Sequence, residues 1–157
     1  MPANAELAAK LKSEGEKSME YYRGLSGPQW DTQVYTEGSI WSIRNILAHL
    51  MTAERAFLEL FENIRRGGAG VSEDFVIDRY NARQQEKTRE LTPEELLRQY
   101  REVRGQMVNW VSGLTDVELG ATGRHPFLGV TTLREMIKMV YIHNQTHYRD
   151  IRRVLSR

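Results

Sequence analysis

The feature that most constrains the fold is an apolar stripe at helical spacing in the last part of the chain, interrupted by polar residues. Its members are Leu133, Met136, Ile137, Val140, Ile151, Val154 and Leu155. Between Val140 and Ile151 the same face carries His143, Asn144 and His147 instead. Residues three or four apart lie on one face of a helix, so this pattern predicts a helix whose buried side holds two histidines and an amide.

The same periodicity recurs along the rest of the chain. Apolar residues at three- or four-residue spacing end at glycine- and proline-rich segments, which commonly terminate helices. We therefore expect long helices at residues 4–23, 41–66, 93–112 and 132–157, a shorter polar helix at residues 73–88, and a loop at residues 113–129. Thr92 and Glu95 have the spacing of a capping box with Pro93 at the first helical position, and Thr132 and Glu135 have the same spacing.

These segments predict an all-α fold. The natural arrangement is a four-helix bundle with a long crossover between its second and third long helices, and that crossover contains the short extra helix. A chain of 157 residues suits one hydrophobic core, so we expect a single domain over residues 1–157.

Composition excludes several classes of function. Lys and Arg number 22 and Asp and Glu 21, so the chain lacks the cationic surplus that nucleic-acid binding draws on. The C-terminal arginines, Arg149, Arg152, Arg153 and Arg157, are typical of cations that complement the dipole of a helix end. The absence of cysteine excludes thiolate ligands and a cysteine nucleophile. We also expect no membrane span and no signal peptide, and by default a cytoplasmic location.

Three of the four histidines are candidate metal ligands. His143 and His147 lie one turn apart on one helix face, about 6 Å along the axis, so both imidazoles could reach one ion. His49 lies near the core face of the second long helix and is the candidate third ligand. His125 lies in the expected loop and is left out of the site, since a loop holds geometry less well than a helix. A buried histidine is also often only a hydrogen-bonded core residue, and spacing alone leaves that alternative open.

The residues next to these histidines in the sequence do not form the motif of a known metalloprotease, but two of them could orient the imidazole rings. No glutamate follows His143 as the metalloprotease helix requires. Asp150 could orient the second ring nitrogen of His147, and Asn45 could do the same for His49. Surface solvation is an equally good reading of Asp150.

Several motifs together resemble one known family. They are the segment from Trp41 to Leu50, which includes His49, then Asp78-Arg79-Tyr80-Asn81, the loop Gly129-Val130-Thr131-Thr132-Leu133, and the closing pair His143 and His147. In this order they resemble the DinB/YfiT-like superfamily, and the resemblance covers nearly the whole chain.

The resemblance implies a bundle in which His49, His143 and His147 bind one divalent ion, often zinc or nickel. It also implies two possible functions. One is a metal-dependent transferase, in which an open position on the ion takes an external low-molecular-weight thiol or water and a small electrophile is attacked. The other is a noncatalytic binding or stress-related protein in which the ion is structural. Members are often homodimers.

Overall fold

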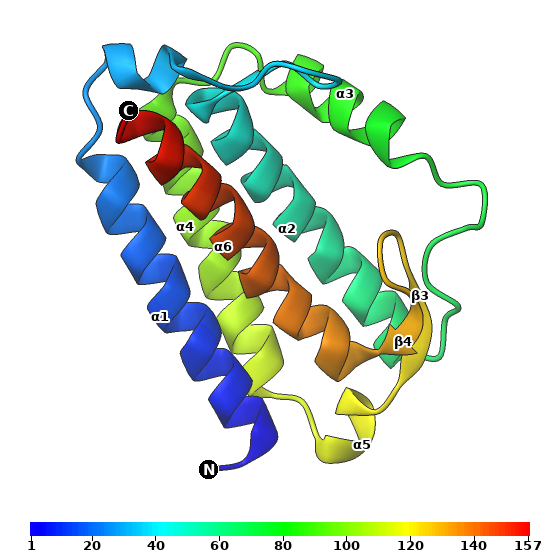
Figure 1. Cartoon of the computed structure of the whole chain (residues 1–157). Coiled ribbons are helices and arrows are strands. Elements are labelled where there is room, and N and C mark those ends of the chain that lie inside the picture. Colours follow the sequence, from blue (N-terminus) through cyan, green and yellow to red (C-terminus); the bar gives the residue numbers. More distant parts are fainter.

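Four long helices pack side by side in a bundle (Figure 1). The structure is a computed structural model that describes residues 1–157. The helices are α1 (Ala3–Arg23), α2 (Ile43–Arg65), α4 (Pro93–Ser112) and α6 (Leu133–Leu155). Helices α1 and α2 each contact both α4 and α6. The predicted all-α four-helix bundle is thus confirmed, and each long helix begins and ends within two residues of its expected bounds.

A long crossover joins α2 to α4, as predicted. These two helices run in the same direction along the bundle, so the connecting chain has to return along its length (Figure 1). The crossover contains the short helix α3 (Ile77–Lys87), which has no buried residue. Helix α3 begins later than the expected residue 73. The reason is a turn at residues 72–75, in which the Ser72 carbonyl accepts from the Phe75 N–H and Val76 then has an extended backbone.

Two small hairpins and two short helical turns complete the fold. A 3₁₀ turn, η1 (Pro28–Asp31), leads into the strands β1 (Gln33–Tyr35) and β2 (Trp41–Ser42). After α4 come α5 (Asp116–Leu119) and the antiparallel strands β3 (Thr122–His125) and β4 (Gly129–Thr132). The expectation of a loop at residues 113–129 is therefore wrong. The glycines and proline of this segment indicate turns. The paired strands do not repeat apolar residues at helical spacing, so the sequence pattern did not reveal them.

Both residues predicted to cap helices lie at helix starts, but only Thr92 forms a complete capping box. The Thr92 hydroxyl accepts from the Glu95 N–H at 3.2 Å, and the Glu95 carboxylate accepts from the Thr92 N–H at 3.2 Å. At α6 the Thr132 hydroxyl accepts from the Glu135 N–H at 3.3 Å, without the reciprocal bond. These contacts fix where α4 and α6 begin.

Replacing the Thr92 cap should weaken the bundle measurably. We expect Thr92→Ala to lower the free energy of unfolding by about 1 kcal/mol, because it leaves an amide at the start of α4 without its acceptor. Urea denaturation checks this value. Thr92→Ser is the matched control, since serine keeps the accepting hydroxyl. Equal destabilisation by both substitutions would contradict a capping role.

The core consists of two apolar clusters separated by a polar layer. One cluster includes Leu11, Phe61 and Met107, and the other includes Leu47 and Tyr100. The layer between them is formed by four residues, one from each long helix, which are Gly15, Glu54, Arg104 and Asn144.

Arg104 is the centre of this layer. Its Nε donates to Oε2 of Glu54 at 2.7 Å, and its Nη2 donates to Oε1 of Glu54 at 2.8 Å. The same side chain donates to the Leu11 carbonyl at 2.8 Å and to Oδ1 of Asn144 at 2.6 Å. A Cβ at Gly15 would lie 2.9 Å from Cγ of Arg104, so glycine is needed there to make room for the guanidinium. One buried cation thereby links all four long helices.

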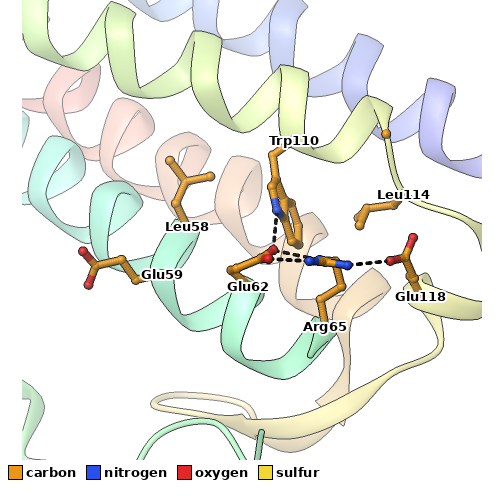
Figure 2. Close-up of a pocket in the computed structure, with 8 residues that line it drawn as sticks. Leu58, Glu59, Glu62, Arg65, Trp110, Leu114 and Glu118 are labelled. Atoms are coloured by element: carbon orange, nitrogen blue, oxygen red, sulfur yellow. Dashed lines mark hydrogen bonds and ion pairs between the residues drawn. The ribbon is translucent and has the colours of Figure 1, made fainter. Parts of the chain in front are cut away.

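A groove of about 680 Å³ lies where α2, α4 and α5 meet. Figure 2 shows Arg65 between the carboxylates of Glu62 and Glu118. The indole N–H of Trp110 donates to Glu62 at 2.9 Å. These contacts tie α5 to the bundle. The groove contains none of the candidate metal ligands and is not the site described below.

No helix is long and apolar enough to cross a membrane.

Candidate metal centre

The structure brings His49, His143 and His147 together. His49 comes from the second turn of α2, and the other two come from the middle of α6. Nε2 of His143 lies 3.0 Å from Nε2 of His49 and 3.0 Å from Nε2 of His147. The three ligand nitrogens all lie within 4.8 Å of one another, so the group could hold a metal ion. We call these three residues the histidine triad.

The tautomer of His147 is set by two residues outside the triad. The Tyr35 hydroxyl donates to Oδ2 of Asp150 at 2.6 Å, and its oxygen lies 2.8 Å from Nδ1 of His147. A tyrosine hydroxyl has one hydrogen. Since Asp150 accepts that hydrogen, Nδ1 of His147 must be the donor to Tyr35. The Nε2 of His147 therefore presents a lone pair to the triad.

Burial keeps the triad uncharged. His49 is only 8% exposed, and its ring packs against Trp41 at a centroid distance of 4.7 Å. Burial, together with charge on the other two histidines, lowers the pKa of His49 to about 2. Burial lowers the pKa of His143 to about 3 and that of His147 to about 4. All three rings are therefore neutral at physiological pH, and a neutral imidazole has one free lone pair.

This donor set fits a divalent metal ion. Imidazole nitrogen bonds to zinc at about 2.0–2.1 Å, so two ligands on one ion lie about 3 Å or slightly more apart. The two separations of 3.0 Å from Nε2 of His143 agree with that value. Neutral imidazoles suit zinc, nickel, copper and iron alike. A hydrogen-bonded neighbour also supports His147, as metal-bound histidines usually require.

The three histidines that the sequence singles out come together, but the two residues expected to orient them behave differently from the prediction. The Asn45 side chain does not hydrogen-bond to His49, because its Oδ1 accepts from Ser42 at the start of α2 and its Nδ2 donates to Gln85. Asp150 orients His147 only through Tyr35. Tyr35 was missed, since no spacing relates it to a residue 112 positions later.

Comparison with known proteins identifies the family. The model of the DinB superfamily matches residues 10–151. The chain belongs to this superfamily. The predicted resemblance is thereby confirmed. No curated protein matches the sequence.

Three solved structures share the fold of this chain. YfiT from Bacillus subtilis, a probable metal-dependent hydrolase with an unusual four-helix bundle topology, is 20% identical with a TM-score of 0.69, over 97% of this chain and 81% of its own. The colibactin self-resistance protein ClbS, solved with double-stranded DNA, is 15% identical with a TM-score of 0.77, over 99% and 97%. The mycothiol-dependent maleylpyruvate isomerase is 13% identical with a TM-score of 0.74, over 96% of this chain and 61% of its own. At these identities the likeness establishes the fold.

Proposed function

We propose that the histidine triad holds one divalent metal ion, zinc or nickel, and that the protein is a metal-dependent transferase acting on a small electrophile. The observation that carries this proposal is the convergence of three neutral ring nitrogens on one point. The triad offers three protein ligands and no fourth. Catalytic sites commonly keep one position open for water or substrate in this way, whereas structural sites are closed by four protein ligands.

The chain supplies positioning and a fixed protonation state. A bound divalent ion would supply Lewis acidity, which favours the anionic, nucleophilic form of an external low-molecular-weight thiol or of water. Tyr35 and Asp150 hold the His147 ring in the tautomer that accepts a cation. Burial, and then the contact with Asp150, raises the pKa of Tyr35, so its hydroxyl stays protonated and bridges the two groups. The absence of cysteine means that any thiol must come from outside the chain.

The similar structures support an external thiol as one candidate for the nucleophile. The maleylpyruvate isomerase among them depends on mycothiol, and YfiT is a probable metal-dependent hydrolase, for which water is the nucleophile. An external thiol and water are thus the two candidates for the nucleophile.

A noncatalytic role is the alternative. The triad joins α2 to α6, and His49 is buried, so an ion held there would also lock two long helices together. In that case removal of the ion costs stability and no chemistry. Access of a small thiol or anion to the bound ion distinguishes the two roles.

Elemental analysis tests metal binding directly. The protein is purified without a chelator or a nickel column, beside a variant with His49, His143 and His147 all replaced by alanine. We expect about one equivalent of metal in the wild type and none in the variant, because the variant lacks all three imidazoles. His125→Asn is the matched control and should retain the ion. A wild type that stays empty and refuses added zinc and nickel would refute the proposal.

Thiol access is measured next in cobalt-substituted protein. A thiolate bound to cobalt produces a charge-transfer absorption band in the near ultraviolet. An enzyme of the proposed kind should show this band on addition of a thiol, together with turnover of a small electrophile. A metal-loaded protein that binds neither thiol nor a small anion has a structural ion.

A further inference from the structure

A second groove, of about 920 Å³, lies between α1 and α6 at the ends of the two helices. Both helices run in the same direction, so their C-terminal ends lie side by side (Figure 1). We call this feature the α1–α6 groove. None of the triad residues lines it, so it is separate from the candidate metal centre.

Cationic side chains from both helices line the α1–α6 groove. They are Lys17 of α1, and Arg149, Arg152 and Arg153 of α6. The acidic residues that line it are only Glu14 and Glu20. Glu14 is already paired with Lys10 at 3.3 Å. The groove therefore carries an excess of positive charge, although the chain as a whole is nearly neutral.

Most of these cations have no anionic partner. Lys17, Arg149 and Arg152 form no ion pair, and Arg153 makes only one, at 3.8 Å from Asp150. Like charges three or four residues apart destabilise a helix. Arg149 has this spacing to both Arg152 and Arg153. The arrangement is therefore unfavourable in the free protein and becomes favourable when an anion binds between the cations.

Helix capping does not account for all of these cations. The backbone N–H of Ser156 caps α6 by donating to carbonyls of its last turn, and no arginine side chain of this helix does so. The helix dipole favours cations, but only within the last turn. Arg152 and Arg153 lie in that turn, as the sequence led us to expect, whereas Arg149 and Lys17 precede the last turns of their helices. The dipole therefore explains only the first two.

A tyrosine orders two of the cations without neutralising them. Nζ of Lys17 lies 5.8 Å, and Cζ of Arg152 lies 5.5 Å, from the ring centroid of Tyr148. Tyr21 packs edge-on against the same ring, with centroids 5.0 Å apart. An aromatic ring attracts a cation but has no net charge, so the positive charge remains available to an anion. Side chains that are ordered in advance also lose less entropy when a ligand binds.

The spacing of the cations favours a ligand with adjacent phosphate groups. Arginine binds phosphate through two parallel N–H donors, and lysine binds it as a point charge. Arg149 and Arg152 lie about 4.5 Å apart along the axis of α6, and Lys17 lines the groove from α1. A chain of two or three phosphates concentrates several negative charges in a short length. It can therefore contact cations of both helices at once, which a single carboxylate cannot do.

We propose that the α1–α6 groove binds a small molecule with adjacent phosphate groups, whose oxygens contact Lys17, Arg149 and Arg152. The ligand neutralises the repulsion among these cations and joins α1 to α6 where both helices end. The site needs no ion at the histidine triad, so this inference is independent of the proposed function.

Inorganic tripolyphosphate is the probe, and metal-free protein is used, because tripolyphosphate also binds divalent ions. In the ¹⁵N-labelled full chain we expect the titration to shift the backbone amide signals of the groove residues on α1 and α6. The Nε–H signals of Arg149 and Arg152 should shift with them, and the signals of His49 should not move. Isothermal titration calorimetry should show one site.

The decisive variant is Arg149→Gln with Arg152→Gln. We expect at least about a tenfold loss of affinity for tripolyphosphate, as for the loss of one hydrogen bond between charged groups. The matched control is Arg98→Gln with Arg101→Gln, which removes the same charge from exposed positions of α4 outside the groove. At constant ionic strength this control should bind tripolyphosphate as tightly as the wild type.

Three results would overturn this inference. The first is equal weakening by both double variants, which would mean attraction by net charge alone. The second is absence of binding, or signal shifts spread over the whole surface. The third is tighter binding of duplex DNA than of tripolyphosphate, which would make the groove part of a nucleic-acid surface. The substituted arginines are all exposed, so the urea midpoints of both variants should match that of the wild type.

Discussion

Glu54→Ala is expected to lower the free energy of unfolding by about 3–5 kcal/mol, a large part of the stability of a chain this size. The substitution removes the carboxylate that forms the ion pair with the Arg104 guanidinium. The side chains of Arg104 and Glu54 are only 6% and 2% exposed. An unpaired cation at that depth cannot recover its hydration, so the folded state bears the full desolvation penalty.

The effect should reach all four long helices. Besides Glu54, Arg104 donates to the Leu11 carbonyl of α1 and to Asn144 of α6, and Tyr100 also donates to Asn144. Loss of Glu54 frees the guanidinium to move and disturbs these bonds together. Because Asn144 is adjacent to His143, we expect metal affinity to fall in the variant as well.

A double-mutant cycle separates the charge from the packing. Glu54→Met alone and Arg104→Met alone should each destabilise, because each leaves the other charged group buried and unpaired. The double variant Glu54→Met with Arg104→Met should recover most of the loss, as buried ion pairs often tolerate joint replacement by apolar residues. Glu102→Ala removes an exposed acid that pairs with Arg98, and serves as the control, with an expected change within about 0.5 kcal/mol. A Glu54→Ala variant as stable as this control would contradict the argument.

The sequence predicts the long helices because their apolar residues repeat at helical spacing and their ends carry recognisable signals. Thr92, Pro93 and Glu95 specify the start of α4 without reference to the rest of the chain. The hairpins β1–β2 and β3–β4 are too short for a period to emerge. They also contact parts of the chain that are distant in sequence, as in the bridge between Gly70 of the crossover and Arg124.

The polar layer was partly visible in the sequence. Asn144 interrupts the apolar stripe of α6, and this position predicts a buried polar group. The burial of Glu54 on α2 was not predicted. Their common partner, Arg104, could not be deduced, because α4 carries several other cations with helical spacing and only the packed bundle decides which is buried.

The histidine triad was likewise predicted in part from the sequence pattern, while its supporting contacts depend on the tertiary structure. The spacing of His143 and His147 predicts a shared face, the position of His49 near the core face of the second long helix makes it the candidate third member, and the family resemblance assigns the same three residues. Tyr35 reaches His147 only through the fold of the N-terminal hairpin. His125 was set aside as a loop residue, and the structure instead places it in a strand with its ring buried. The positions of Tyr35 and His125 both depend on tertiary contacts, which the spacing of residues in the sequence does not show.

Acid should destabilise the metal-free protein, and the triad should account for most of the loss. Burial first, and then charge on neighbouring histidines for His49 and His143, lowers the folded-state pKa values to about 2, 3 and 4 for His49, His143 and His147. The unfolded chain has histidine pKa values near 6.5. As pH falls below about 6.5 the unfolded chain binds protons that the folded chain does not, so stability decreases with decreasing pH.

Within this window each histidine lowers the free energy of unfolding by about 1.4 kcal/mol per pH unit. The three residues of the triad should therefore lower it by about 4–6 kcal/mol between pH 7 and pH 5. For His147 the loss levels off near pH 4, while for His143 and His49 it continues to lower pH. Urea unfolding of chelator-treated protein at constant ionic strength measures it. The triple alanine variant of His49, His143 and His147 should show a much flatter profile, with a remaining slope from His125, whose pKa burial also lowers. Parallel profiles for the two proteins would mean that the triad is protonated in the folded state, and its nitrogens would then be unavailable to a cation at the same pH.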